Sequence, residues 1–283
     1  MRGGRFSRGW QLTKASWRAL RADRSLLTFP VISGISTILV AVALFTPAAL
    51  LSDGGDRRVP LIVAAVLAAY LGTFIAVGCN VALASGAARS LEGERTTVGE
   101  GLATARGRVG AIAVWAAIAA TVGLALRALE STAENNILAR IALAFVGVAW
   151  GVATFFVVPI LALEGVTGSA ALKRSAQLIR ERWGESVAGS FSIGGIVFLV
   201  AVLPGIALGV AAASASAVAG VALGVAGALV LLAAMIVGSA LSMIFRTALY
   251  RFATEGRATG GFEQTELADA FAPKRHRGRL AVG

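Results

Sequence analysis

Residues 154–186, TFFVVPILALEGVTGSAALKRSAQLIRERWGES, contain three consecutive parts that together predict the architecture of the chain. The first part ends a long apolar run and carries Pro159, which should disturb the last turn of a helix. A Glu-Gly turn follows at Glu164 and Gly165. The third part, 172–183, has bulky apolar residues on one side and basic residues on the other. This pattern predicts a short amphipathic helix at a membrane interface.

The predicted helix at 172–183 has a definite register. Gly165 should end the helix before it, and Ser169 can cap its beginning. At 100° per residue, the apolar arc holds Leu172, Ala176, Ile179 and Trp183, while the polar side holds Lys173, Arg174, Gln177, Arg180 and Glu181. We expect Glu164 to form an interfacial ion pair with Arg174 or another basic residue. Whether Glu164 and this basic helix have a function beyond structure stays open at this point.

The composition is typical of a polytopic helical membrane protein. The 283 residues are 57% hydrophobic and 14% charged, whereas a soluble domain has about 25% charged residues. The net charge is +11, but the basic residues lie in short segments between apolar runs. They therefore predict topology and contacts with anionic headgroups, and nucleic acid is not an expected partner. With one cysteine, Cys79, and one histidine, His276, we expect no disulfide framework, metal site or cofactor.

The apolar runs predict an all-α fold with six transmembrane helices. The predicted spans are residues 29–51, 60–84, 109–129, 137–163, 187–212 and 218–245. The last two come from one run, 186–245, that contains no charged residue and is much longer than the roughly 20 residues that one span needs. We accordingly divide the chain into an N-terminal amphipathic segment (1–28), a membrane domain (29–251) and a basic, partly disordered tail (252–283).

The charges predict the orientation of these spans. If the N-terminus is cytoplasmic, 22 of the 26 Lys and Arg residues lie in inside segments, and only Arg57, Arg58, Arg127 and Arg140 lie outside or at the outer edge. This bias places both termini in the cytoplasm of a cell-membrane protein. The segments 6–84, 97–163 and 169–245 then form three helical hairpins, each entered through a basic amphipathic helix.

Two of these entry segments carry further signals. In the N-terminal segment, one helical arc holds Leu12, Ser16, Leu20, Trp17 and Trp10. This face either lies in the headgroup plane or packs on the cytoplasmic side of the bundle. In the second entry segment, Thr97 and Glu100 have capping-box spacing, which starts a helix by pairing free N–H groups.

Four stretches resemble a bacterial, mostly actinobacterial, family of integral membrane proteins that is classed as a domain of unknown function. They are GRFSRGWQLTKASWRALRAD, EGERTTVGEGLATARGR, ATFFVVPILALEGVTGSAALKRSAQLIRERWGE and GGFEQTELADAF. The third also resembles the membrane domain attached to some glycerophosphodiester phosphodiesterases. The resemblance implies no catalytic domain in this chain, because the carboxylates and histidines of the soluble phosphodiesterase have no counterpart in it. It transfers no functional residues.

Three function classes remain open at this stage. The first is a non-enzymatic membrane protein that binds anionic lipid, a second copy or a membrane partner protein through its cytoplasmic helices. The second is a small transporter or channel for a neutral or lipid-like substrate, since Pro159 and Pro204 could interrupt helices. Against it, no ionisable residue lies deep in any predicted span. The third is an enzyme, with Glu92, Glu94, Glu100 and Glu164 as the only candidates. We interpret these carboxylates as salt-bridged surface groups and expect no enzyme.

Overall fold

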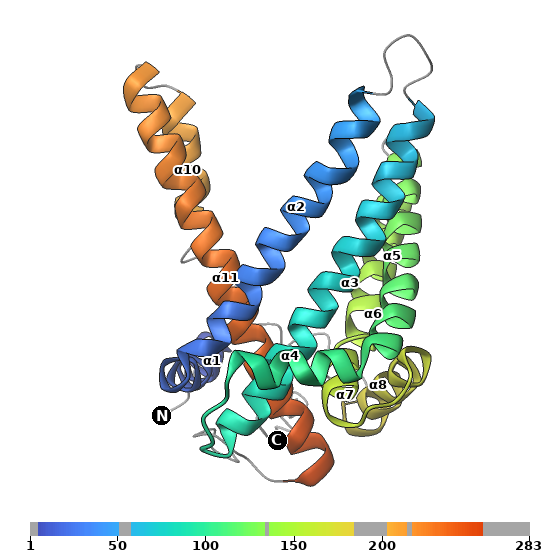
Figure 1. Cartoon of the computed structure of the whole chain (residues 1–283), viewed down its shortest axis with the longest axis vertical. Helices are drawn as coiled ribbons and strands as arrows, with labels where there is room; N and C mark the ends of the chain where they lie inside the picture. The colour runs from blue at the N-terminus through green and yellow to red at the C-terminus, as the bar shows by residue number, and fades with distance from the viewer. Residues whose placement is uncertain (1–4, 51–57, 134–135, 184–202, 214–216, 257–283) are drawn as a thin grey trace, which may run out of the picture.

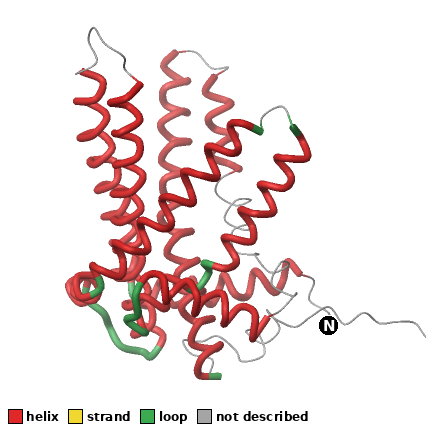
Figure 2. Tube along the Cα trace, turned by 90° about the vertical axis from the view of Figure 1, so that its right-hand side faces the viewer, coloured by secondary structure: helices red, strands yellow, loops and turns green. Residues whose placement is uncertain are grey.

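The computed structural model describes residues 5–50, 58–133, 136–183, 203–213 and 217–256, and these ranges contain helices without any strand (Figures 1 and 2). The all-α prediction is therefore confirmed. In chain order, the helices are α1 (Arg5–Ala22), the short 3-10 helix η1 (Arg24–Leu27), α2 (Thr28–Leu50), α3 (Arg58–Leu91), α4 (Val98–Gly107), α5 (Val109–Thr132), α6 (Ile137–Ala153), α7 (Val157–Leu163), α8 (Gly168–Trp183), α10 (Leu203–Ala213) and α11 (Ala217–Glu255).

Five helical segments of the described ranges are long and apolar enough to cross a membrane: Arg24–Leu50, Arg58–Leu91, Val109–Thr132, Ile137–Leu163 and Ala219–Glu255. They coincide with the first four predicted spans and the sixth. The predicted span 187–212 falls largely on residues 184–202, outside the described residues, and α10 contains its end. The chain thus has the helices of a multi-pass membrane protein.

The long helices form two groups that meet at one end. α2 and α5 both pack against α3, and α10 packs against α11. In Figure 1, α10 and α11 (orange to red) lean away from α2 and α3, and the two groups converge at the lower end of the view. α1, η1, α4, α7, α8 and the last turns of α11 gather there, with α1 seen nearly end-on and therefore lying across the spans. We call this region the basic end.

The core of the described chain lies toward the basic end. Phe29, Leu83, Ile160 and Ile244 come from four different helices and are almost fully buried there. Toward the opposite end the large apolar side chains face outward, as at Leu39, which is 63% exposed. A surface of this kind is compatible with lipid rather than water around it.

Glycine makes one of the core contacts possible. A Cβ atom on Gly101 of α4 would lie 2.6 Å from Cζ of Phe29 and 3.0 Å from the backbone oxygen of Ala82 in α3. Phe29 therefore fits between α3 and α4 only because residue 101 has no side chain. This contact joins the first span to the second entry helix.

α1 packs on the bundle, through a face that differs from the predicted one. Ser16 and Leu20 are buried as expected, but their buried neighbours are Ala15 and Ala19, and Trp17 is 38% exposed. α1 packs against α11, so the packing alternative holds for Ser16 and Leu20 of the expected arc, whereas Trp17 of the same arc stays at the surface. The side chains of Trp10 and Leu12 lie outside the described residues.

α8 is also rotated relative to its predicted register. Its buried face contains Ala171, Ser175, Leu178 and Ile179, whereas Ala176 is exposed. The helix packs against α5, α6 and α7, so a protein contact rather than lipid alone determines which face is covered. The side chain of Trp183 lies outside the described residues.

The fourth predicted span is interrupted within its length. α6 ends at Ala153 and α7 begins at Val157, one turn earlier than the disturbance expected at the end of the helix. The reason is that a proline ring collides with the carbonyl four residues before it, which for Pro159 belongs to Phe155. Gly165 ends α7 with a positive φ of +70°, as predicted.

The cap of α8 comes from a different residue than expected. The side-chain oxygen of Thr167 accepts a hydrogen bond from the N–H of Ala170 at 3.4 Å. Thr167 directly precedes the first residue of α8, so it takes the capping position that was predicted for Ser169.

Candidate functional site

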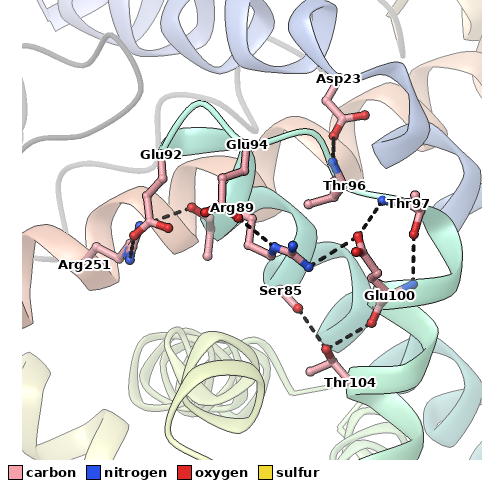
Figure 3. A network of polar contacts seen from close by, with 11 residues as sticks. Asp23, Ser85, Arg89, Glu92, Glu94, Thr96, Thr97, Glu100, Thr104 and Arg251 are labelled. Atoms are coloured by element: carbon pink, nitrogen blue, oxygen red, sulfur yellow. Dashed lines mark hydrogen bonds and ion pairs between the residues drawn. The ribbon is translucent and has the colours of Figure 1, made fainter.

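The corner between α3 and α4 is held by a capping box and an arginine (Figure 3). Glu100 accepts a hydrogen bond from the N–H of Thr97 at 3.0 Å, and Thr97 Oγ1 accepts one from the N–H of Glu100 at 3.3 Å. The predicted capping box is thereby confirmed. Arg89 reaches both Glu94, at 3.0 Å, and Glu100, at 3.3 Å. The hydrogen bonds with Thr97 and the charge of Arg89 hold the pKa of Glu100 below its usual range.

Asp23 joins the first entry segment to this corner. Its carboxylate accepts hydrogen bonds from the N–H and hydroxyl of Ser25, at 3.1 and 2.5 Å, and from the N–H and hydroxyl of Thr96, at 3.3 and 2.6 Å. Burial alone would raise the pKa of Asp23, but these four hydrogen bonds outweigh it and lower the pKa. The ionised carboxylate therefore stabilises the turn between α1 and η1 and fixes it against the α3–α4 loop.

Arg251 connects the end of α11 to the end of α3. Its side chain is only 14% exposed and pairs with Glu92, the first residue after α3. It also pairs, at 3.3 Å, with Glu255 one turn further along α11. It also donates to the backbone oxygen of Ala88 at 3.1 Å. A mostly buried arginine with these partners is a structural clamp between two helices.

Glu164 lies where α7, α8 and α11 meet. Its Oε1 atom accepts a hydrogen bond from the hydroxyl of Tyr250 at 2.5 Å and lies 3.5 Å from Nε of Arg174. The predicted ion pair with Arg174 is therefore confirmed. The contact with Tyr250 was not foreseen, because nothing in the sequence indicates which residue of α11 faces the Glu-Gly turn.

Arg246 is the residue that sequence reasoning missed. It lies in α11, within the candidate span Ala219–Glu255, and its guanidinium carbon is 4.8 Å from the ring centre of Phe155. Phe155 meets Phe156 edge-on at 4.9 Å, and Phe156 lies 6.0 Å from Tyr250. The sixth predicted span ends at residue 245, directly before Arg246, whereas α11 continues without a break to Glu255.

The carboxylates that were candidates for catalysis all have basic partners. Glu92 pairs with Arg251, Glu94 and Glu100 pair with Arg89, and Glu164 pairs with Arg174. Within the described ranges, no group of three or more His, Cys, Asp or Glu side chains is placed to hold a metal ion. Cys79 is buried in α3, and His276 lies outside the described residues.

A family model described as "Family of unknown function (DUF6159)" matches residues 59–261. The chain belongs to the DUF6159 family. The DUF6159 match begins within the first turn of α3 and runs past the end of α11, so it includes Arg89, Glu164, Arg246 and Arg251 but not α1, η1 and α2. No curated protein and no solved structure matches the chain.

Proposed function

We propose that the protein is a non-enzymatic, multi-pass protein of the cell membrane that binds anionic lipid headgroups through its basic end. In this proposal the basic end is cytoplasmic, both termini lie inside, and residues 187–212 complete six spans arranged as three hairpins. The bias of Lys and Arg toward the segments at this end supports the orientation. The partial likeness to phosphodiesterase-associated membrane domains adds a lipid context to the proposal.

One observation carries the lipid-binding proposal: several exposed cations of the basic end have no carboxylate partner among the described residues, while Glu92, Glu94, Glu100, Glu164 and Glu255 are already paired with arginines. At the basic end, the exposed cations without a carboxylate partner among the described residues include Arg18, Arg21, Arg24, Arg95, Arg106, Lys173 and Arg180. They come from α1, η1, α8 and the α3–α4 region. Such a surface attracts the anionic headgroups of an inner leaflet.

The exposed face of α1 supports the same proposal. Trp17 is partly exposed, and the guanidinium of Arg21 lies 5.2 Å from its ring centre. Because α1 lies across the spans (Figure 1), this pair can sit in the headgroup layer, with the indole toward the acyl chains and the cation toward phosphate.

A charge-reversal experiment tests the lipid-binding proposal. The double variant Lys173→Glu/Arg180→Glu leaves Glu164 and its partner Arg174 intact. We expect it to bind fluorescent short-chain phosphatidylglycerol at least about 30-fold more weakly in micelles, since each basic residue contributes about 1 kcal/mol. The matched control is Arg127→Glu/Arg140→Glu, which changes the same charge at the opposite end and should bind like the wild type. Equal affinity in both variants would remove the proposal.

The orientation has a test of its own. Arg95 lies in the α3–α4 loop and Arg127 near the far end of α5, and both are exposed. In whole cells, a membrane-impermeant thiol reagent should label Arg127→Cys and leave Arg95→Cys unlabelled until the membrane is opened. Buried Cys79 should contribute little background. Labelling of Arg95→Cys in intact cells would reverse the proposed orientation.

A second candidate function is a small transporter or channel for a neutral or lipid-like substrate. The observation that favours it is the interruption between α6 and α7, since transporters use discontinuous helices within their spans. If this function is correct, proteoliposomes that contain the protein should exchange labelled phospholipid between leaflets faster than empty vesicles. Equal rates would leave only the binding function.

A further inference from the structure

Arg246 is held inward, in a part of α11 that belongs to a candidate span. It lies five residues before Arg251, which corresponds to about 7.5 Å along a helix. Its guanidinium lies on the ring of Phe155, which is only 9% exposed. The side chain therefore lies against the α6–α7 interruption, where its guanidinium meets an aromatic ring.

The charge of Arg246 has no counter-charge in the described part of the chain. No carboxylate pairs with it there, and none of its N–H groups donates a hydrogen bond to a described residue. The ring of Phe155 covers one face of the guanidinium and accepts none of the in-plane hydrogen bonds. A cation without a counter-charge near hydrocarbon is costly, and ionisable residues at such positions typically mark functional sites.

The groups around Arg246 restrict what that ligand can be. Tyr250, one turn further along α11 than Arg246, donates a hydrogen bond to Glu164, and that carboxylate is also paired with Arg174. Arg246 itself is partly buried rather than enclosed, so its nitrogens can be reached from outside. A planar guanidinium with free in-plane donors matches two oxygens of one phosphate. A phospholipid would supply both that phosphate and acyl chains that can cover the apolar surface of the spans.

We propose that Arg246, stacked on Phe155, binds the phosphate of a single anionic phospholipid at the junction of α11 with the α6–α7 interruption. This inference rests on the proposed lipid-binding function and assigns one tight site within it. The exposed cations of the basic end would attract headgroups generally, whereas Arg246 would hold one lipid by a bidentate contact.

Thermal unfolding in micelles tests this site, with phosphatidylglycerol as the probe and phosphatidylcholine and inorganic phosphate as comparison ligands. A ligand that binds the folded protein raises Tm by mass action. We expect phosphatidylglycerol to raise the Tm of the wild type. Arg246→Gln should lose that increase and weaken phosphatidylglycerol binding roughly tenfold or more, because the two charge-assisted hydrogen bonds disappear. Arg246→Lys should keep part of the increase, since it retains the charge but not the planar fork.

The unliganded Tm separates a lipid site from a structural role. Because Arg246 has no carboxylate or hydrogen-bond partner among the described residues, Arg246→Gln should unfold without lipid at the wild-type Tm or above it. A lower unliganded Tm in this variant would assign Arg246 to the fold and overturn the proposal. Arg140→Gln removes the same charge at an exposed site of α6 and should keep the full response to phosphatidylglycerol.

The remaining outcomes distinguish this site from the general proposal. If Arg246→Gln responds to phosphatidylglycerol like the wild type while Lys173→Glu/Arg180→Glu does not, the Arg246 site is wrong and the general binding function stands. If neither variant differs from the wild type, both are wrong. If inorganic phosphate raises Tm as much as phosphatidylglycerol does, the ligand is a soluble phosphate and the lipid assignment fails.

Discussion

Ser175 of α8 accepts a hydrogen bond from the backbone N–H of Phe156 at 3.1 Å, at the point where the fourth span is interrupted. The same hydroxyl donates to the backbone oxygen of Ala153 at 2.7 Å. Ser175 and Phe156 are both fully buried. One side chain therefore pairs two backbone groups on either side of the break, which would otherwise be unsatisfied in an apolar environment.

Replacing this hydroxyl should destabilise the fold. We expect Ser175→Ala to lower the free energy of unfolding by about 1–3 kcal/mol, because a buried N–H and a buried carbonyl lose their partner together. Thermal or denaturant unfolding in micelles measures this change. Ser131 serves as the control, since its hydroxyl bonds within its own helix at an exposed position, and Ser131→Ala should stay within about 0.5 kcal/mol of the wild type. Similar losses in the two variants would contradict the role of Ser175.

The turn after α7 should not tolerate a side chain. Gly165 has a φ of +70°, and a Cβ atom there would lie 1.7 Å from Nη1 of Arg108. Gly165→Ala should cost about 1–2 kcal/mol for the left-handed backbone alone, and displacement of Arg108 should add to this. The double variant Gly165→Ala/Arg108→Ala should recover only the stability lost through displacement of Arg108, because the left-handed backbone at residue 165 remains strained. Gly107→Ala, where the added atom meets open space, should be close to neutral, and an equal cost there would refute the argument.

Asp23 should make part of the stability depend on pH. Its pKa in the folded protein lies below the ordinary value of 3.8. A depressed pKa means that the ionised carboxylate contributes stability above that value and that this contribution is lost as the pH falls through the folded pKa. At pH 7, Asp23→Asn should lower the unfolding free energy by about 1 kcal/mol, as for other caps.

The comparison of wild type and Asp23→Asn across pH isolates this group. Glu100 also has a lowered pKa, but it is present in both proteins and cancels in their difference. That difference should shrink as the pH falls below the ordinary value of Asp23. A difference in Tm that stays constant down to acid pH would show that the charge of Asp23 contributes nothing.

The two arginines near the end of α3, Arg89 and Arg251, should contribute differently to the free energy of unfolding. Arg251 is 14% exposed and donates a hydrogen bond to the backbone oxygen of Ala88, whereas Arg89 is 41% exposed and its side chain pairs with the carboxylates of Glu94 and Glu100. Arg251→Gln should cost about 2 kcal/mol, the value of a hydrogen-bonded charge away from water. Arg89→Gln should cost less than about 1 kcal/mol, because exposed ion pairs are weak. Denaturant unfolding in micelles measures the free energy of unfolding of both variants. A larger loss in Arg89→Gln than in Arg251→Gln would contradict the assignment of Arg251 as the clamp.

Local sequence signals predicted those features that depend on neighbouring residues. Runs of about 20 apolar residues identified five of the described spans. The Thr97–Glu100 capping box and the left-handed Gly165 were also predicted correctly. In each case the interaction partners are within a few residues along the chain, so spacing alone contains the information.

Packing faces could not be predicted to the same degree. A helical wheel ranks residues by apolarity, and it placed Trp17 on the apolar arc of α1 and Ala176 on that of α8, although both are exposed. The structure instead buries small residues in α1 and the hydroxyl of Ser175 in α8. Which face of each helix is buried depends on the shape of the surface that it packs against, and a local sequence pattern does not contain that information.

By itself, the sequence determined that the described residues are helical, where five long apolar helices lie and which segments between them are basic. The reason is that lipid requires long apolar helices and the charges stand between them. The tertiary structure alone decided which charges are satisfied. It brought Tyr250 to Glu164 and Arg251 to Glu92 across long stretches of chain, and it left Arg246 on Phe155 without an acidic partner in the described residues. Pairing of this kind depends on how helices cross, and crossing is a property of the whole packed bundle.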